Sequence, residues 1–305
     1  RDLHSFPTRR SSDLDPKMHV SDGNTRLIGL FASPIRHSSS PRMQNLAFLK
    51  CGINMQYLAF EVNEEHLQEA VNAIRILDMP GANISMPNKI RVIEYLDALS
   101  EEAYLIGAVN TIVNTDGRLT GYNTDGLGYV AALRKEGIVL EESTLTLVGA
   151  GGAATAIAIT AALSGLKKLY IFNAKDSFYA NAMKTKQKIE ENTDTVVAVQ
   201  DLADDEALKE AIACSNILTN ATNMGMKPLL KQTWLKDASY LHRDLLVTDT
   251  VYAPEETLFL HMAKEAGCRV RNGYGMMLYQ GAEAFRLWTG MEMPAEEIGG
   301  EMGIL

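Results

Sequence analysis

Residues 144–154 read TLTLVGAGGAA, and this stretch decides the fold. Its first five residues are threonine, leucine and valine, a composition typical of a β-strand. A glycine turn follows at 149–152, and the alanine-rich run behind it has high helix propensity. A second apolar run, LYIF at 169–172, comes after Gly165 and completes a β-α-β unit of about the expected 30 residues. The stretch therefore predicts parallel strands joined by a crossover helix.

The glycine turn also predicts a binding site. Gly149, Gly151 and Ala154 match the three small-residue positions of the G-x-G-x-x-G/A pattern. Glycines let backbone N–H groups approach a pyrophosphate, and the N-terminus of the next helix adds unpaired donors and partial positive charge. A turn that only joins a strand to a helix has a similar composition, but the β-α-β context favours a dinucleotide. The residues expected to contact it are Gly149, Ala150, Gly151, Gly152 and Ala153.

The end of the second strand is where a dinucleotide-binding fold reads the adenosine ribose. The sequence there is Asn173-Ala174-Lys175-Asp176. The carboxylate of Asp176 could accept hydrogen bonds from both ribose hydroxyls. Aspartate is also a favoured N-cap, so Asp176 could cap a helix that starts near Ser177. The two interpretations are compatible, and the sequence leaves both open.

Apolar runs alternate with amphipathic segments on both sides of this unit. Upstream, runs at 27–31 and 57–62 precede an amphipathic segment at 64–77, a rhythm that indicates an α/β fold. Downstream, strands are predicted at 217–219 and 246–248 in the same sheet as 144–148. The segment 273–305 is predicted to be helical and to return to the first part of the chain, because helical spacing relates Met276, Met277, Gln280 and Ala284.

The bulk composition excludes several classes of protein. At 305 residues and 33.5 kDa the chain is longer than most single domains, so two domains are expected. A net charge of -9 argues against a nucleic-acid binder, and the apolar stretch 153–166 is too short for a membrane span of about 20 residues. The three cysteines, Cys51, Cys214 and Cys268, are far apart and form no CxxC pair, so neither disulfides nor a zinc site are expected. The cytoplasm is therefore the expected compartment.

Residues 1–17 read RDLHSFPTRRSSDLDPK and differ in character from the rest. They do not begin with methionine, and they have neither a regular period nor the apolar core of a signal peptide. We expect a foreign or disordered leader here.

Three polar clusters lie upstream of the glycine turn, in apolar or glycine-rich surroundings. They are SPIRHSSSP at 33–41, GANISMPNK at 81–89, and the segment 107–126, which contains GAVNT and GYNTDG. Each cluster alone has the composition of a turn or a helix cap, and Lys89 alone would more often be a solvated surface lysine. Together they suit a site for a polar ligand.

The order and spacing of these motifs resemble the shikimate dehydrogenase family. The matching segments are LIGLFASPIRHSSSP, NISMPNK, IGAVNTIV, GYNTDG, VGAGGA and GYGMMLYQGAEAF, and the resemblance covers roughly 26–303. NISMPNK, the FNAKD stretch and GMKP are more similar to the quinate/shikimate branch than to the strictly biosynthetic enzymes. The resemblance implies an NAD(P)-dependent dehydrogenase that reversibly oxidises shikimate to 3-dehydroshikimate and quinate to 3-dehydroquinate.

The resemblance also implies roles for individual residues. Ser38 and Ser40 would hold the substrate carboxylate, and Lys89 and Asp125 would lie beside the reacting C3 oxygen. Tyr252 would close over the substrate or the cofactor. The remaining implied contacts are Ser85, Asn110 and Gln280 to the ring hydroxyls, and Asn173, Asp176, Asn223, Thr250 and Gly273 to the cofactor.

The implied reaction is a hydride transfer coupled to proton movement at an oxygen. A cation that is hydrogen-bonded to this oxygen stabilises its developing negative charge, and Lys89 is the candidate. Asp125 can orient Lys89 and complete a proton-relay pair, although the sequence does not say which of the two moves the proton. His37 lies inside the serine motif and is expected to shape that loop. No metal is expected.

The cofactor side departs from the family pattern. Relatives often have arginine after the strand-two asparagine, where this chain has Ala174 followed by Lys175. The quinate/shikimate branch tends to have lysine before GMKP, where this chain has Asn223 in ATNMGMKP. Arginine is the usual partner of a 2′-phosphate, so we expect NAD to be preferred and NADP to be a weaker second cofactor.

The pattern and the resemblance together predict two domains. The first is an α/β substrate-binding catalytic domain at 18–123, completed by about 275–305. The second, at 124–274, is a Rossmann-like, doubly wound NAD(P)-binding domain. A homodimer is a candidate assembly. Two other functions stay open: a dehydrogenase for a related cyclic acid of the aminobenzoate type, and a non-catalytic dinucleotide-binding regulatory module.

Overall fold

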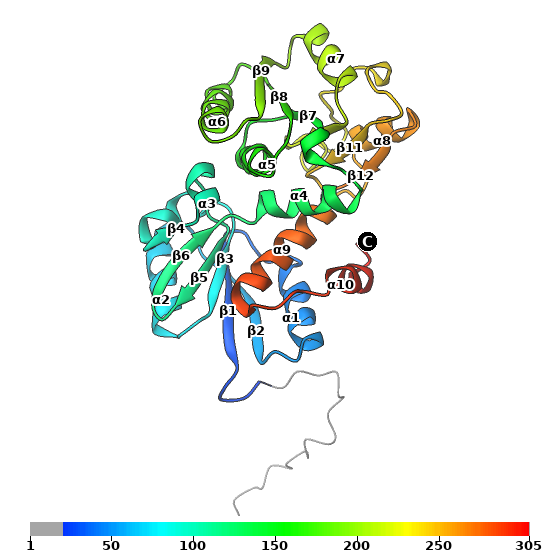
Figure 1. The fold of residues 1–305 in the computed structure, drawn as a ribbon. Coiled ribbons are helices and arrows are strands. Elements are labelled where there is room, and N and C mark those ends of the chain that lie inside the picture. The colour runs from blue at the N-terminus through cyan, green and yellow to red at the C-terminus, as the bar shows by residue number, and fades with distance from the viewer. Residues whose placement is uncertain (1–20, 305) are drawn as a thin grey trace, which may run out of the picture.

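The computed structural model describes residues 21–304 and contains two six-stranded sheets with helices packed around them (Figure 1). This architecture confirms the α/β prediction. The expected leader, residues 1–17, lies outside the described residues. Within 21–304, no helix is both long and apolar enough to cross a membrane.

The first sheet has the strand order β2-β1-β3-β5-β6-β4, with β5 antiparallel to both of its neighbours. One face of this sheet is covered by α2 and the other by α1. Its elements are β1 (Arg26–Ala32), α1 (Ser40–Lys50), β2 (Met55–Glu61), η2 (Glu64–His66), α2 (Leu67–Ile76), β3 (Gly81–Ile84), η3 (Arg91–Tyr95), β4 (Ala98–Leu99), α3 (Glu101–Ile106), β5 (Thr111–Thr115) and β6 (Arg118–Tyr122).

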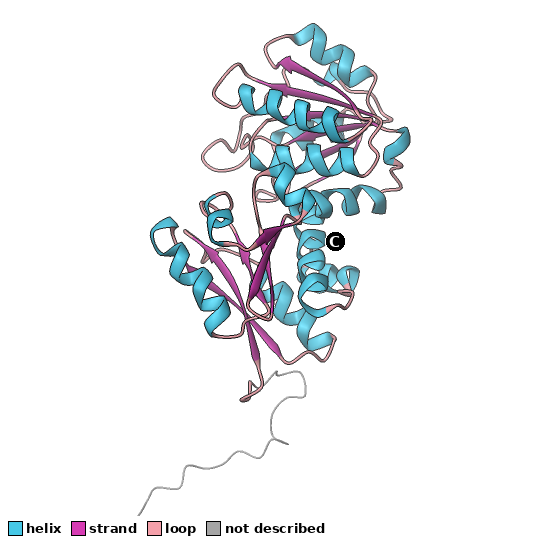
Figure 2. Ribbon diagram, turned by 60° about the vertical axis from the view of Figure 1, so that its left-hand side comes forward, coloured by secondary structure: helices cyan, strands magenta, loops and turns pink. Residues whose placement is uncertain are grey.

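The second sheet has the order β12-β11-β10-β7-β8-β9, and all its strands are parallel. This is the doubly wound order, and apolar cores with helices lie on both faces (Figure 2). Its elements are α4 (Asp125–Lys135), η4 (Leu140–Glu142), β7 (Thr144–Val148), α5 (Gly152–Leu163), β8 (Lys168–Asn173), α6 (Tyr179–Asn192), β9 (Val196–Asp201), α7 (Asp205–Ala213), β10 (Ile217–Asn220), η5 (Ala238–Tyr240), β11 (Leu246–Asp249), α8 (Leu258–Glu265) and β12 (Arg269–Arg271).

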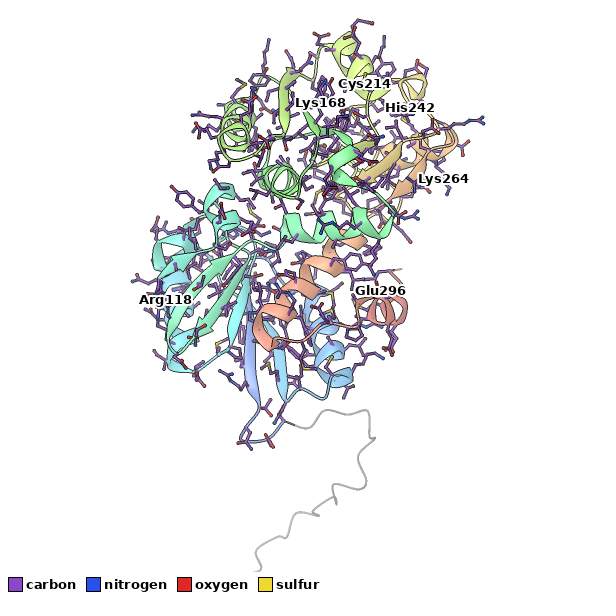
Figure 3. The ribbon with its side chains drawn as sticks, in the orientation of Figure 1. Arg118, Lys168, Cys214, His242, Lys264 and Glu296 are labelled. Atoms are coloured by element: carbon purple, nitrogen blue, oxygen red, sulfur yellow. The ribbon has the colours of Figure 1, made fainter. Side chains whose placement is uncertain are left out.

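The C-terminal helices α9 (Tyr274–Thr289) and α10 (Ala295–Met302) return to the first sheet, as predicted. In Figure 1 they lie beside β1 and α1, at the opposite end of the colour scale. Phe285 of α9 stacks on Phe48 of α1, with ring centroids 5.4 Å apart. Lys135 of α4 forms an ion pair with Glu296 of α10. Figure 3 labels Glu296. The hydrophobic core between the first sheet and α1 is therefore completed by α9 and α10, at the end of the chain.

The predicted strands agree with the structure to within a few residues. The strand at 144–148 has the predicted bounds, and the one at 27–31 extends by one residue at each end. The segment 64–77 is divided, because Asn63 accepts a hydrogen bond from the His66 backbone and caps a 3-10 turn before α2 begins at Leu67. The domain boundary near 124 stays a prediction; β6 ends at Tyr122 and β7 begins at Thr144.

Candidate active site

A cavity of about 330 Å³ lies between the two sheets, with walls from both halves of the chain. Most of the walls come from the loop before α1, from β3 and its following loop, and from α4 and α9. The other wall comes from Ala153 in the first turn of α5, from the loop after β11 and from Gly273. The predicted site residues that line this cavity are Ser38, Ser40, Ser85, Lys89, Asn110, Asp125, Ala153, Thr250, Tyr252, Gly273 and Gln280.

Lys89 and Asp125 form a partly buried ion pair in the wall of the cavity. Lys89 Nζ lies 2.5 Å from Asp125 Oδ2, and the side chains are 23% and 17% exposed. Asp125 is the first residue of α4, where the helix dipole favours a carboxylate. The Lys89 carbonyl accepts a 2.8 Å hydrogen bond from the Val109 backbone, which fixes the lysine at its base. The pair therefore places an ammonium and a carboxylate at one point of the cavity.

Asn110 holds Asp125 in place. Its Nδ2 donates to Asp125 Oδ1 at 2.9 Å, and its Oδ1 accepts from the Thr124 backbone N–H at 2.8 Å. Gln280 Oε1 of α9 is 3.5 Å from the same Asn110 Nδ2. Asn110 thus faces the cavity and also orients the carboxylate, so its side chain connects the ion pair to the C-terminal helix.

Asn83 and Tyr57 support the site and were missed by the sequence interpretation. Asn83 lines the cavity, accepts from Tyr57 OH at 2.7 Å, and donates to the Asn110 carbonyl at 3.0 Å. Burial raises the pKa of Tyr57, so its hydroxyl stays a donor. A signal was present, because Asn83 is the polar residue in the otherwise apolar strand GANI, all of which is buried.

The serine loop lies at the N-terminus of α1. Ser38 Oγ accepts a 3.2 Å hydrogen bond from the Ser40 backbone N–H, and both serines line the cavity. His37 lines it too. Hydroxyl donors beside a helix N-terminus suit an anionic group such as a carboxylate.

The glycine turn has the geometry that a pyrophosphate needs. Gly149 has a φ of +118°, and a Cβ there would lie 2.7 Å from the Ala221 carbonyl oxygen. At Gly151 and Gly152 a Cβ would meet no atom within 4 Å, so the space above the turn is open. The helix α5 begins at Gly152, and its first turn points free N–H groups at this space.

The segment between β8 and α6 shows that one of the two interpretations of Asp176 is wrong. The helix α6 begins at Tyr179 with Phe178 as its N-cap, so Asp176 is not the cap and that interpretation is wrong. Asp176 Oδ1 instead accepts from the Phe178 backbone at 2.8 Å and from Asn173 Nδ2 at 2.9 Å. The helix starts two residues later than expected, at Tyr179 and not near Ser177, and Asp176 closes the turn between strand and helix.

Thr250, Tyr252 and Gly273 also line the cavity. The rings of Tyr252 and Tyr274 lie 5.4 Å apart. A Cβ on Gly273 would lie 2.2 Å from the Thr250 carbonyl oxygen, so only glycine fits there. The predicted cofactor residues outside this cavity lie near the ends of β7, β8 and β10; they are Gly149, Ala150, Gly151, Gly152, Asn173, Asp176 and Asn223.

No group of histidine, cysteine, aspartate or glutamate side chains within residues 21–304 is arranged to hold a metal ion. The cavity offers a ligand the cation of Lys89, the carboxylate of Asp125 and several hydrogen-bond donors.

Two family models match the chain. The shikimate dehydrogenase substrate binding domain matches residues 30–112, and the shikimate 5'-dehydrogenase C-terminal domain matches 273–298. A quinate/shikimate dehydrogenase of Escherichia coli is 50% identical over 277 residues, which cover 91% of this chain and 96% of that protein. A shikimate dehydrogenase (NADP(+)) of Listeria monocytogenes is 52% identical over 276 residues, 90% of this chain and 95% of that protein.

A solved structure has the same fold over nearly the whole chain. It is shikimate 5-dehydrogenase from Listeria monocytogenes in complex with shikimate and NAD, with a TM-score of 0.91 and 50% sequence identity. The match covers 94% of this chain and 100% of that chain.

Proposed function

The chain belongs to the shikimate dehydrogenase family, and from this premise we propose that Lys89 and Asp125 are the catalytic pair of its dehydrogenase reaction. The reaction is the NAD(P)-dependent oxidation of shikimate and quinate, and it is reversible. The observation that carries the assignment is the 2.5 Å contact between Lys89 Nζ and Asp125 Oδ2 in the wall of the cavity.

The substrate side of the cavity holds a polyhydroxylated acid by its two ends. Ser38 and Ser40 bind the carboxylate at the N-terminus of α1, and Ser85, Asn110 and Gln280 hydrogen-bond the ring hydroxyls. Lys89 donates a hydrogen bond to the reacting oxygen and stabilises the negative charge that develops on it. The proton of that hydroxyl passes to the Lys89 and Asp125 pair, and it returns from the pair in the reverse direction.

The cofactor side fits a dinucleotide along the carboxyl ends of the parallel strands. Bound nicotinamide supplies the hydride acceptor or donor. The N-terminus of α5 and the open glycine turn bind the pyrophosphate, and Ala153 joins that turn to the main cavity. Thr250, Tyr252 and Gly273 bound the nicotinamide end, and Asn223 lies in the loop after β10.

NAD is the preferred cofactor in this proposal, with NADP second. Asp176 uses Oδ1 within its own turn, which leaves Oδ2 to accept hydrogen bonds from the adenosine ribose. Lys175 Nζ lies 3.4 Å from Asp201 Oδ2, so a carboxylate already accompanies the cation that could pair with a 2′-phosphate. With Ala174 in the neighbouring position, the ribose end offers a phosphate little positive charge.

We further propose a cytoplasmic homodimer. Three unpaired cysteines, Cys51, Cys214 and Cys268, suit a reducing compartment. The strand β2 ends the first sheet, its outer edge has no partner strand within residues 21–304, and Leu58 on it is 48% exposed. Light scattering on the purified protein tests the assembly.

The experiment that tests the function is a steady-state matrix of shikimate and quinate against NAD and NADP, without added metal. We expect reduction of the nicotinamide with shikimate, and turnover that a chelator leaves unchanged. Absence of reduction with both acids, in protein with a cooperative melt, contradicts the proposal. Cofactor binding without turnover would indicate a regulatory module instead.

A further inference from the structure

Asp249 is a buried carboxylate at the end of β11, and none of the assignments above uses it. Its side chain is 3% exposed. Asp249 Oδ1 accepts from Asn220 Nδ2 and from the Val251 backbone N–H, each at 2.9 Å, and Oδ2 accepts from Thr257 Oγ1 at 2.7 Å. Removing a carboxylate from water costs several kcal/mol, so three donors aimed at one buried group need an explanation.

Through Asn220, Asp249 connects to the loop after β10. Asn220 Oδ1 accepts from Thr222 Oγ1 at 2.7 Å and from Trp234 Nε1 at 3.1 Å. Its Nδ2, besides donating to Asp249, donates to the Met224 carbonyl at 3.2 Å. The conformation of residues 221–224 therefore depends on the amide that Asp249 orients.

Asp249 also connects to the loop after β11. Thr257, its third partner, is the N-cap of α8, so the carboxylate joins the two ends of residues 249–257. Between these ends, the Thr250 backbone donates to the Asn220 carbonyl and the Val251 carbonyl accepts from Gly273, both at 3.0 Å. Asp249 itself lines a smaller cavity of about 90 Å³ and not the main one.

We propose that Asp249 is a positioning residue for the nicotinamide end of the cofactor site. Its carboxylate holds the loops after β10 and β11 in one arrangement, so that Thr250, Tyr252 and Gly273 line the main cavity. This role rests on the proposed function, because it assumes that the wall in question receives a nicotinamide cofactor.

The charge on Asp249 matters to this role. Ionised, the carboxylate accepts from all three donors; protonated on Oδ2, it can keep Thr257 as a partner only if that hydroxyl turns to accept. Burial raises the pKa of Asp249 to about 6, so this change falls within the range of an assay. The other titratable side chains of the small cavity are Tyr129, Glu136 and Arg271, and the last two pair with each other at 2.6 Å.

The test compares Asp249→Asn with Glu255→Gln, a matched change at an exposed carboxylate of the same loop. NADH binding is measured by fluorescence titration, and KM is measured separately for NAD and shikimate from pH 5 to 8. We expect Asp249→Asn to raise the NADH Kd and the KM for NAD about five- to tenfold, with the KM for shikimate within about twofold. In wild type the NADH Kd and the KM for NAD should rise in the same way as the pH falls below 6. In Asp249→Asn neither constant should change around pH 6.

A second pair of variants keeps Asp249 in place. Thr257→Ser retains the hydroxyl and should bind NADH like wild type, whereas Thr257→Val should weaken binding about two- to fivefold. Equal NADH affinity in the two Thr257 variants, or in Asp249→Asn and Glu255→Gln, overturns the positioning role. Equal losses for cofactor and shikimate also overturn it. Wild-type protein that binds NADH but does not oxidise shikimate contradicts the proposed function alone.

Discussion

The catalytic role proposed for Lys89 depends on residues that are distant from it in sequence. Its partner Asp125 is held by Asn110 and by the start of α4, so the ammonium lies at a defined point of the cavity. Because a contact to the reacting oxygen strengthens in the transition state, we predict that Lys89→Ala lowers kcat at least about 100-fold and changes KM for shikimate much less. Steady-state kinetics check this.

The control is Lys135→Ala, which removes a lysine whose ion pair with Glu296 lies outside the cavity. Its kcat should stay within about twofold of wild type, since an exposed ion pair outside the cavity touches neither substrate nor cofactor and contributes little to stability. Near-native kcat in Lys89→Ala would mean that the catalytic pair lies elsewhere.

The proposed cofactor preference rests on residues near the end of β8. We predict that NAD exceeds NADP in kcat/KM by roughly ten- to a hundredfold, because Ala174 offers a 2′-phosphate no positive charge and the carboxylate of Asp176 would repel it. Ala174→Arg should narrow this ratio. The measurement uses both cofactors at saturating shikimate, and an unchanged ratio would show that position 174 does not face the phosphate.

Asp249 makes the free energy of unfolding depend on pH in an unusual direction. Burial raises its pKa from 3.8 to about 6, so the folded protein holds this proton more tightly than the unfolded chain does. The stabilisation is fully present below pH 4 and is lost as the pH rises through 6. We predict that the unfolding free energy of wild type relative to Asp249→Asn falls by up to about 3 kcal/mol between pH 4 and 7. Urea titrations of both proteins measure this, and a pH-independent difference would contradict it.

Among the elements, α4 packs tightly against two other helices, because glycines let it approach them. A Cβ on Gly126 would lie 2.4 Å from the Ala156 carbonyl of α5, and a Cβ on Gly128 would lie 2.4 Å from the Gln280 backbone of α9. The helix that carries Asp125 is thus packed directly against the helix that carries Gln280. Any side chain at Gly128 has to separate them.

We predict that Gly128→Ala lowers the free energy of unfolding by about 1 to 3 kcal/mol and raises KM for shikimate, because backbone atoms cannot move aside as a flexible side chain can. Gly300→Ala is the matched control, since a Cβ there meets nothing within 4 Å in α10. That change should be neutral or stabilising by up to about 1 kcal/mol. Equal melting temperatures for the two variants would refute the packing argument.

At the scale of the whole molecule, the first sheet depends on the end of the chain. The core formed by β1 and α1 includes Phe285 and Trp288 of α9 and Ile298 of α10. The cores on the two faces of the second sheet come almost entirely from residues 124–274, and α3 adds only Leu105 and Ile106 to one of them. We predict that residues 124–274 expressed alone unfold cooperatively, and that residues 18–123 alone do not. Circular dichroism during thermal unfolding distinguishes them. A cooperative transition in the 18–123 fragment would show that its core is complete without α9 and α10.

Local sequence by itself determined the parts of this protein whose physics is local. The strand at 144–148, the glycine turn and the helix after it follow from β propensity, glycine conformation and helix propensity, each acting over a few residues. The order of the polar motifs predicted the family and placed Lys89 and Asp125 among the candidates.

Only the tertiary structure decided which side chains meet. Asn110, Asp125 and Gln280 come from three separate segments, and their hydrogen bonds exist because α4 and α9 pack together between the two sheets. Residue type was also insufficient over a short range at Asp176. Aspartate suited a helix cap, but the helix begins only at Tyr179, and the carboxylate closes the turn before it. Residue type sets what a side chain can bind, whereas its partners depend on packing between segments far apart in the chain, which no local pattern encodes.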